Sequence, residues 1–227
     1  MRLLLRCHVA RLGVDSAQMS DEERDSKEPG PAEGQRFLGG SFLVSEIALM
    51  DPNFRQTVVL MISHDDNGAF GLVVNRPSPF TLGDVVEGLD ETPAASIPVF
   101  IGGPVQQEIL FLLHAEFPRR PGDEDAAVPV EGVISEPATV SLIEYLKNEW
   151  GSLPPEDRPA VRVYAGYSGW GPVQLEGELK AEAWVVVKAT KELIFRPDAA
   201  GAWEDAFARK GPLYQIILQT GFKPSMN

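Results

Sequence analysis

The chain has 227 residues, of which 44% are hydrophobic and 23% charged, proportions that are ordinary for a globular protein. Its net charge of −13 argues against a large nucleic-acid footprint, because such a footprint needs Lys and Arg against phosphates. The single cysteine, Cys7, excludes an internal disulfide framework and a multi-cysteine metal site, and no segment approaches the roughly 18 apolar residues that cross a bilayer. These totals favour one domain and a cytoplasmic location.

Residues 1–34 are predicted to be a disordered acidic tail ahead of a domain at residues 35–227. Residues 15–34 contain seven acidic and two basic residues, two prolines and few apolar groups. Such a segment buries too little apolar surface to offset the entropy that ordering costs. The run from Met19 through Asp21 and Glu22 also resembles an ordinary cytosolic N-terminus, so translation from Met1 and from Met19 both stay open.

The first part of the domain is predicted to contain a β-hairpin. Thr57–His64 is an apolar, β-branched run typical of a strand buried on both faces, and Ala69–Asn75 forms the return strand. Between them, Asp65–Gly68 contains Asn-Gly, a dipeptide that two-residue hairpin turns prefer. A shorter strand at 41–45 precedes the hairpin, and Pro77 is expected to end the return strand because it lacks a backbone donor.

Strands and helices alternate in the rest of the chain. Thr81 is a candidate N-cap for a short helix over residues 81–87, and Leu142, Leu146 and Trp150 share one face of a helix over 139–150 that Gly151 ends. Further strands are expected at 99–101, 109–114, 128–134, 161–164 and 184–187, a loop at 118–127, helices at 172–181 and 202–209, and either helix or strand at 213–218. Hairpins followed by this alternation predict a single α+β domain with a mixed sheet rather than a doubly wound parallel one.

Gly166–Gly171, a glycine-rich segment around Trp170, is predicted to be a loop between a strand and a helix. It begins like the nucleophile elbow G-x-S-x-G, but Trp170 stands where the elbow needs a glycine after Ser168. A catalytic serine would also need His64 or His114, the two histidines of the folded region, as its base. A small-molecule hydrolase that uses Ser168 with one of them is the alternative hypothesis.

The same segment allows two further interpretations. As a dinucleotide loop it lacks the third glycine, because Gln174 occupies that position, and Glu176 and Glu178 would crowd the phosphate. As one wall of a pocket it offers the Trp170 ring and the glycine amides as donors. The structural alternative is a rigid corner in which Trp170 packs into the core and the glycines adopt unusual backbone angles.

No metal or cofactor site is predicted. His64 and His114 each end an apolar strand, and neither comes with three identifiable protein ligands. Gly102–Val105 resembles an anion-binding turn in outline, and Arg76 is the one arginine among these glycine segments. The structural alternatives are a plain turn at Gly102–Val105 and surface pairing of Arg76 with an acid.

Several segments, taken in order, resemble the YqgE/AlgH family. They are Asp51-Pro52-Asn53-Phe54, Thr57–Leu60, His64, Gly68–Pro77, Gly102–Val105, the strand ending at His114, Gly166–Gly171 with Gln174-Leu175-Glu176, and Trp184. The resemblance spans about residues 36–220 and implies an α+β domain whose bifurcated, largely antiparallel sheet bends towards a pseudo-barrel with flanking helices. It also implies a bacterial-type cytosolic protein without an established activity or cofactor, in a family of which one branch is labelled a transcriptional regulator of alginate synthesis.

Together these observations predict a non-enzymatic cytosolic binding or regulatory protein. Its partner, a protein or a small molecule, and its oligomeric state stay open, whereas direct DNA binding and membrane insertion are not expected. The site is expected where glycine-rich turns that follow strands converge at one end of the sheet. The candidate binding residues are Asn75, Arg76, Gly102, Gly103, Pro104, Tyr167, Ser168, Gly169, Trp170 and Gln174.

Overall fold

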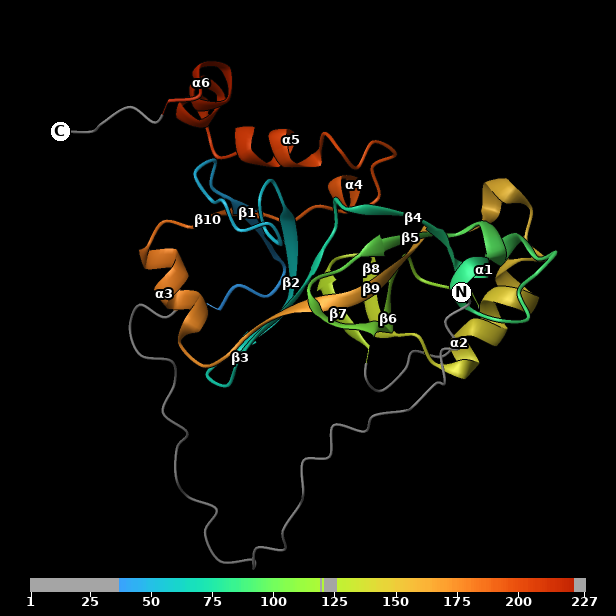
Figure 1. The fold of residues 1–227 in the computed structure, drawn as a ribbon. Helices are drawn as coiled ribbons and strands as arrows, with labels where there is room; N and C mark the ends of the chain where they lie inside the picture. Colours follow the sequence, from blue (N-terminus) through green and yellow to red (C-terminus); the bar gives the residue numbers. More distant parts are fainter. Residues whose placement is uncertain (1–36, 119, 121–125, 223–227) are drawn as a thin grey trace, which may run out of the picture.

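The structure is a computed structural model, and it describes residues 37–118, 120 and 126–222 (Figure 1). The tail predicted at residues 1–34 and part of the loop predicted at 118–127 lie outside the described residues. No helix in the described ranges is both long and apolar enough to span a membrane.

Strands dominate the described part of the chain. They are β1 (Ser41–Ser45), β2 (Val58–Asp65), β3 (Gly68–Val73), β4 (Pro77–Thr81), β5 (Pro98–Ile101), β6 (Val105–His114), β7 (Ala127–Val130), β8 (Val133–Pro137), β9 (Val161–Trp170) and β10 (Trp184–Lys188). These ten strands form one sheet with the path β10-β1-β2-β3-β9-β6-β8-β7, which β5 joins through β9 and β4 through β5. Every pair is antiparallel except β5 with β9, so the predicted mixed, largely antiparallel sheet is confirmed.

The sheet bends back on itself without closing. Strand β7, at one end of the path, contacts β2, although the two are not hydrogen-bonded strand partners within the described ranges. The turn before β1 also lies close to β7, because Gly40 donates to the Met61 carbonyl of β2 at 2.9 Å and a Cβ added at Gly40 would lie 2.3 Å from the carbonyl oxygen of Pro129 in β7. The predicted bend towards a pseudo-barrel is therefore confirmed, with the sheet left open.

Short helices surround the sheet on three sides (Figure 1). They are α1 (Leu82–Val85), α2 (Val140–Tyr145), α3 (Gln174–Lys180), α4 (Lys191–Ile194), α5 (Ala202–Ala208) and α6 (Pro212–Thr220), with 3-10 turns at Pro93–Ser96 and Pro155–Asp157 and a π-helical turn at Leu146–Trp150 that continues α2. Helix α5 packs on β1, β2 and β10, and α3 packs on β3 and β10. The N-cap predicted at Thr81 is confirmed, and it forms a capping box in which the Thr81 backbone N–H donates to Asp84 Oδ2 at 2.8 Å.

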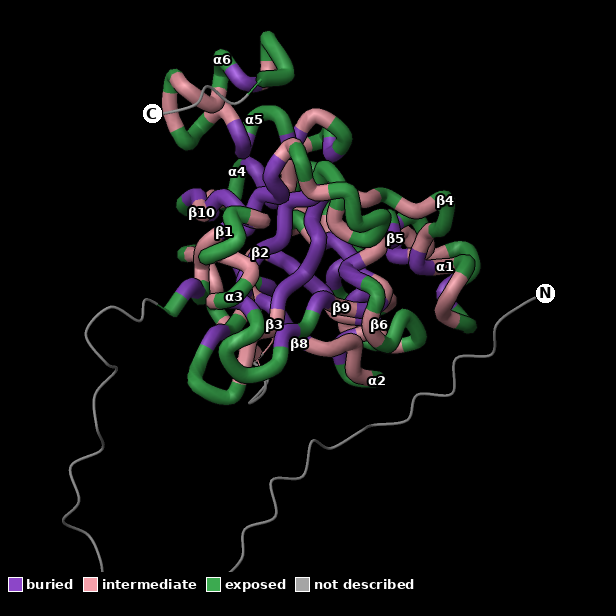
Figure 2. The backbone as a smooth tube through the Cα atoms, turned by 60° about the vertical axis from the view of Figure 1, so that its left-hand side comes forward, coloured by how far each residue is buried: buried purple, intermediate pink, exposed green. Residues whose placement is uncertain are grey.

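The strands of the sheet are largely buried (Figure 2), and core clusters lie on both of its faces. Along β2, Val58 and Leu60 pack with α5, whereas Val59 and Met61 pack in the cluster that covers α3, so the strand is buried on both faces as predicted. Leu142, Leu146 and Trp150 share a third cluster with residues of α1, which confirms the predicted helix face. The sequence pattern therefore predicted correctly which faces of β2 and of the helix over residues 139–150 are buried.

Two predicted elements were wrong in detail, and one strand was not predicted. Residues 128–134 are not one strand but the hairpin of β7 and β8, which turns at Gly132 with φ +69. The return strand β3 ends at Val73, before Pro77 as predicted, but Pro77–Thr81 then forms the unpredicted strand β4, an edge strand where a missing donor is tolerated. The predicted loop at Gly166–Gly171 is largely strand, since β9 runs through to Trp170.

Strand β9 is where the sheet divides. Its first half pairs with β5 through Val163–Ala165, and its last residues pair with β3 through Ser168–Trp170. Both partners lie along the same edge of β9, because β6 occupies the other edge from Val161 to Tyr167. Strands β3 and β5 therefore diverge from one point on β9, and the turns that follow them meet there.

Candidate functional site

Three glycines mark the point where β3 and β5 diverge. Cβ atoms added at Gly102 and Gly103 would lie 2.3 Å from the Gly166 carbonyl oxygen and 2.1 Å from backbone atoms of Tyr167. Gly166 has φ +70, and a Cβ there would lie 2.7 Å from the Val105 carbonyl oxygen. Side chains do not fit at these positions, so close backbone contact accounts for the glycines. We call the contact of Gly102-Gly103 with Gly166-Tyr167 the strand crossing.

Arg76 lies beside the strand crossing because its carbonyl accepts from the Ile101 N–H at 2.9 Å. Its Nη2 donates to two backbone carbonyls of the preceding loop, Pro52 at 3.0 Å and Arg55 at 3.2 Å. Burial lowers the pKa of Arg76 from its ordinary value, and the negative charge of Asp51 partly offsets that effect. Arg76 makes no ion pair with any described carboxylate. The guanidinium is thus a half-buried cation held by neutral acceptors.

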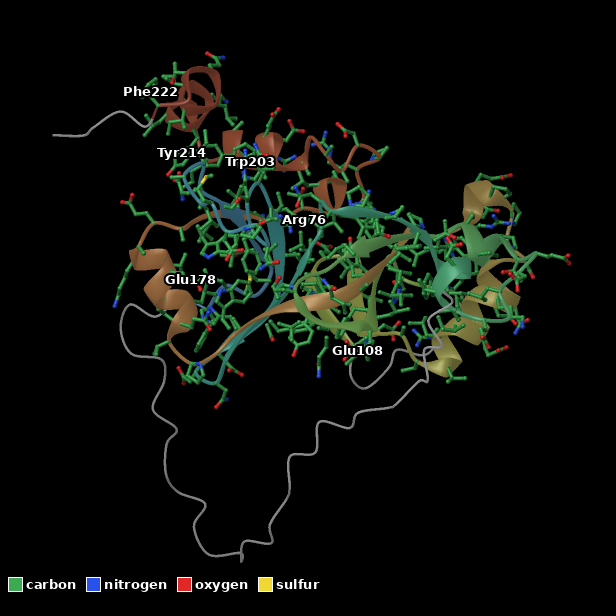
Figure 3. All side chains as sticks on the ribbon, viewed as in Figure 1. Arg76, Glu108, Glu178, Trp203, Tyr214 and Phe222 are labelled. Atoms are coloured by element: carbon green, nitrogen blue, oxygen red, sulfur yellow. The ribbon has the colours of Figure 1, made fainter. Side chains whose placement is uncertain are left out.

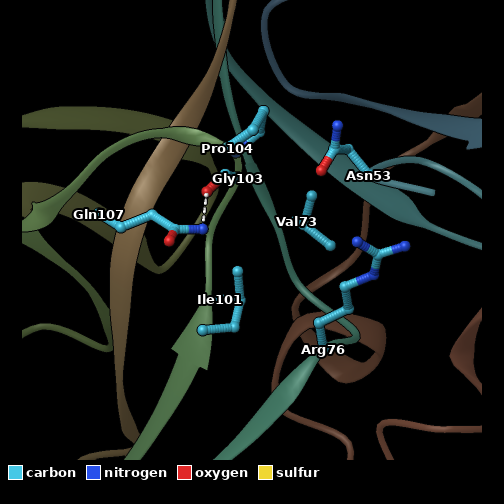
Figure 4. A pocket seen from close by; sticks show the side chains of 7 residues that line it. All are labelled: Asn53, Val73, Arg76, Ile101, Gly103, Pro104 and Gln107. Carbon is cyan, nitrogen blue, oxygen red and sulfur yellow. Dashed lines mark hydrogen bonds between the residues drawn. The ribbon is translucent and has the colours of Figure 1, made fainter. Parts of the chain in front are cut away.

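A small pocket of about 110 Å³ opens at this place. We call it the crossing pocket, and its lining residues are Asn53, Val73, Arg76, Ile101, Gly103, Pro104 and Gln107. Arg76 and Asn53 lie on one side and Gln107 on the other, with apolar side chains between them (Figure 4). The Gln107 amide donates to the Gly103 carbonyl at 3.2 Å, which ties this side chain to the turn.

Three of the predicted site residues, Arg76, Gly103 and Pro104, line the crossing pocket. Gly102 belongs to the strand crossing and is not a lining residue. Asn75 is buried outside the lining, where its Oδ1 accepts from the Val58 N–H and its Nδ2 donates to the Gln56 carbonyl, both at 2.9 Å. Asn75 therefore holds backbone in place rather than facing a ligand.

The other predicted residues lie along β9 and beyond, outside the lining. The Tyr167 ring packs against Phe70 and Phe111, with ring centroids 5.0 and 6.0 Å away. Gly169 pairs with Phe70 in the β3–β9 ladder. Trp170 and Gln174 belong to a separate cluster around α3.

That cluster is organised by one carboxylate. Glu178 Oε2 accepts from the indole N–H groups of Trp170 at 2.9 Å and Trp184 at 2.7 Å, and its Oε1 accepts from the Gln174 amide at 3.0 Å. The Phe54 ring stacks on Trp170 and meets Trp184 edge-on. Glu178 lies well apart from Arg76 in Figure 3. Trp170 thus fastens α3 to the sheet, and it is a core residue that the structural interpretation anticipated.

Ser168 is not assembled into a catalytic triad. It is fully buried, and its Oγ donates to the Gly102 carbonyl at 3.4 Å. His64 accepts the Leu38 N–H at Nδ1 and faces Glu176 at Nε2. His114 donates from Nδ1 to the Ala115 carbonyl and faces Glu136 at Nε2. Both nitrogens of both rings are engaged away from Ser168, so neither histidine is placed to act as its base.

A second buried polar group joins β6 to β8. Glu136 accepts from His114 Nε2 at 2.7 Å and from Arg120 at both carboxylate oxygens, while Phe117 stacks on the His114 ring with centroids 3.9 Å apart. Burial would raise the pKa of Glu136, but the hydrogen bonds from His114 and Arg120 outweigh it and leave that pKa below its ordinary value. The group is fully paired, which favours a structural role for it.

No group of three His, Cys, Asp or Glu residues in the described ranges is arranged to hold a metal ion. Four lining residues of the crossing pocket were not among the predicted ones: Asn53, Val73, Ile101 and Gln107. The sequence carried a weak signal for two of them, because Asn53 and Gln107 are amides next to segments that were singled out.

The fold and site define an α+β domain with an open, bent sheet and a pocket at the strand crossing, and the comparisons identify its family. The AlgH-like family model matches residues 42–215, so the chain belongs to that family. A UPF0301 protein of Anaeromyxobacter dehalogenans is 36% identical over 189 residues, covering 80% of this chain and 92% of that protein. A UPF0301 protein of Streptomyces avermitilis is 34% identical over 193 residues, covering 84% and 95%.

Solved structures agree with this assignment. The solution structure of the AlgH protein from Pseudomonas aeruginosa superposes with a TM-score of 0.62 at 28% identity, covering 88% of this chain and all of that one (100%). A crystal structure of a Corynebacterium diphtheriae protein has a TM-score of 0.61 at 20% identity, which shows the shared fold alone. The predicted family is confirmed, and it is one whose function is uncharacterised.

Proposed function

We propose that this chain is a non-enzymatic binding protein and that its site is the crossing pocket. The supporting observation is convergence of segments far apart in sequence. The Arg76 carbonyl accepts from Ile101, and the turn at Gly103 touches Tyr167, so segments near residues 76, 103 and 167 meet around one opening. The pocket gathers a cation and two amides around one opening, and polar groups of this kind orient ligands in binding sites.

The proposal gives no role to a nucleophile, because the buried Ser168 has no base in reach. It keeps the cytoplasmic location expected from the sequence. It leaves out direct DNA contact, since a net charge of −13 opposes phosphate binding. A regulatory role, if the protein has one, would act through the partner that occupies the pocket.

Native purification of the full-length protein, followed by mass spectrometry of bound small molecules and proteins, tests the proposal. Three proteins are compared: wild type, Arg76→Gln and Arg158→Gln. Arg158 is a matched control, because it is also half-buried and also donates to two backbone carbonyls, Leu153 and Gly151 at 3.0 Å each, but does not line the pocket.

We expect a bound species that is retained by wild type and Arg158→Gln and lost from Arg76→Gln. A species that stays on Arg76→Gln at the wild-type level contradicts the proposal. So does a wild-type protein that retains nothing when it is purified from its own cells.

A further inference from the structure

The size of the crossing pocket limits what enters it. Sites for drug-sized ligands and cofactors occupy roughly 300–1,000 Å³, whereas this pocket has about 110 Å³. A nucleotide or a whole cofactor does not fit in that space. A single head group with a few attached carbon atoms does.

The charge of the pocket identifies the head group. Arg76 is the charged residue of the lining, and the remaining polar groups are the neutral amides of Asn53 and Gln107. Only Nη2 of Arg76 is engaged by described acceptors, the carbonyls of Pro52 and Arg55. These two bonds fix the plane of the guanidinium and leave Nη1 and Nε as donors without a described acceptor. A fixed guanidinium with open donors recognises oxyanions.

One unit of negative charge suits the pocket better than two. A phosphate dianion would meet a single guanidinium here, in a protein whose net charge is −13. The overall field of the protein repels anions in proportion to their charge. A carboxylate carries one charge, and the half-buried side chain of Ile101 offers a surface for the carbon atoms attached to it.

Backbone strain lies on both sides of the pocket. Gln56 and Gln106 adopt left-handed backbone angles, with φ of 54 and 46, although neither is glycine. Gln106 precedes the lining residue Gln107, and Gln56 follows Arg55, whose carbonyl holds Arg76. Such angles are energetically costly and often occur at ligand sites, although Glu91, Val173 and Glu182 adopt them away from this pocket.

We infer that the crossing pocket binds a single carboxylate group, with Arg76 as its partner and an apolar stem against Ile101. The carboxylate belongs either to a small monocarboxylic acid or to the end of a protein chain. This inference rests on the proposed function, because it names the chemistry of the same site.

Titration of the full-length, ¹⁵N-labelled protein with propionate tests the inference, and propionamide is the matched uncharged probe. The signals to follow are the Gly103 amide, the Gln107 side-chain amide and the Arg76 Nε–H. We expect saturable shifts with propionate at a Kd in the millimolar range, about −4 kcal/mol of binding free energy. Propionamide should bind about tenfold more weakly or worse, because hydrogen bonds to a charged group are the stronger ones. Arg76→Gln should lose the propionate response, and Arg158→Gln should keep it.

Further titrations distinguish the two sources of the carboxylate, and they distinguish failure of this inference from failure of the proposed function. A short peptide with a free C-terminus and its amidated form are titrated beside propionate. If the free peptide binds more tightly than propionate and its amidated form does not, the carboxylate belongs to a protein chain end. If propionate binds more tightly than the free peptide, it belongs to a small acid. Equal binding of propionate and propionamide, or tighter binding of inorganic phosphate, overturns the carboxylate assignment while leaving the proposed function standing. A native bound species that is independent of Arg76 overturns the proposed function itself.

Discussion

Gly103→Ala is the substitution that tests the strand crossing most severely. The added Cβ would lie 2.1 Å from both the carbonyl carbon and oxygen of Tyr167 and 2.5 Å from the backbone nitrogen of Ser168. These are backbone atoms of β9, so no side chain can rotate to make room. Overpacking a core costs about 1–3 kcal/mol and occasionally more, and because backbone must move here we expect a loss of about 3 kcal/mol or more.

Two other glycines provide graded controls for the same chemical change. At Gly169 the Cβ would meet the edge of the Tyr167 ring at 3.1 Å, which can shift, so we expect a cost below about 1 kcal/mol. At Gly177, inside α3, nothing lies within 4 Å. Alanine is the better helix former there, and Gly177→Ala should stabilise the protein by about 0.5–1 kcal/mol.

Urea unfolding of the three variants beside wild type measures these free energies. The predicted order of stability is Gly177→Ala above wild type, Gly169→Ala slightly below it, and Gly103→Ala far below it or unfolded. The free energy of unfolding of Gly103→Ala is to be compared with the usual range for surface substitutions, about 0.5 kcal/mol from wild type. If the variant falls within that range, the backbone contact at the strand crossing is not what requires glycine.

Other predictions concern the two polar clusters and one buried hydroxyl. Glu178→Ala leaves two indole N–H groups without their carboxylate and should lower the free energy of unfolding by about 2 kcal/mol, with a shifted tryptophan emission. An unchanged urea midpoint and emission would contradict a stabilising role for these two hydrogen bonds. The Tyr164 hydroxyl is buried and has no geometrically sound hydrogen bond to a described residue. Burial raises its pKa to about 12, although the nearby Arg162 acts in the opposite direction. Tyr164→Phe should therefore raise stability by about 1 kcal/mol, and a clear loss in urea unfolding would show that the hydroxyl is paired. The pKa of Glu136 is lower in the folded protein than in the unfolded chain, so the stability that its carboxylate contributes is complete above the unfolded pKa of about 4.3 and is lost as the pH falls through the lower folded pKa. Urea midpoints measured between pH 7 and pH 3 should therefore fall less steeply for Glu136→Gln than for wild type. Parallel curves would count against the predicted linkage.

Local patterns predicted much of the fold because their causes are local. The Asn-Gly turn of Asp65–Gly68 and the spacing of Leu142, Leu146 and Trp150 act within one hairpin or one helix, and both are present in the structure. The hairpin ends before Pro77 as predicted, but strand β4 was missed because it begins at Pro77 and lies on an edge, where the absent N–H has no ladder to break.

The glycine-tryptophan segment shows why the site was only partly predictable. Its glycines suggested a loop, but they are required by contact with Gly102-Gly103, some 60 residues earlier, and contacts at that separation leave no local pattern. The same reason applies to Asn53 and Gln107, which reach the pocket only because the sheet divides at β9. Trp170 was grouped with the site by its neighbours in sequence, although its indole N–H points to Glu178.

A crystal structure of the protein with propionate bound is the most direct test of the central claim, that the crossing pocket is a carboxylate site. We expect the carboxylate in contact with the open nitrogens of Arg76 at about 2.7–2.9 Å, with the methyl group of propionate against Ile101. Propionate at another place on the protein, with Arg76 still bound only to the carbonyls of Pro52 and Arg55, would contradict the claim.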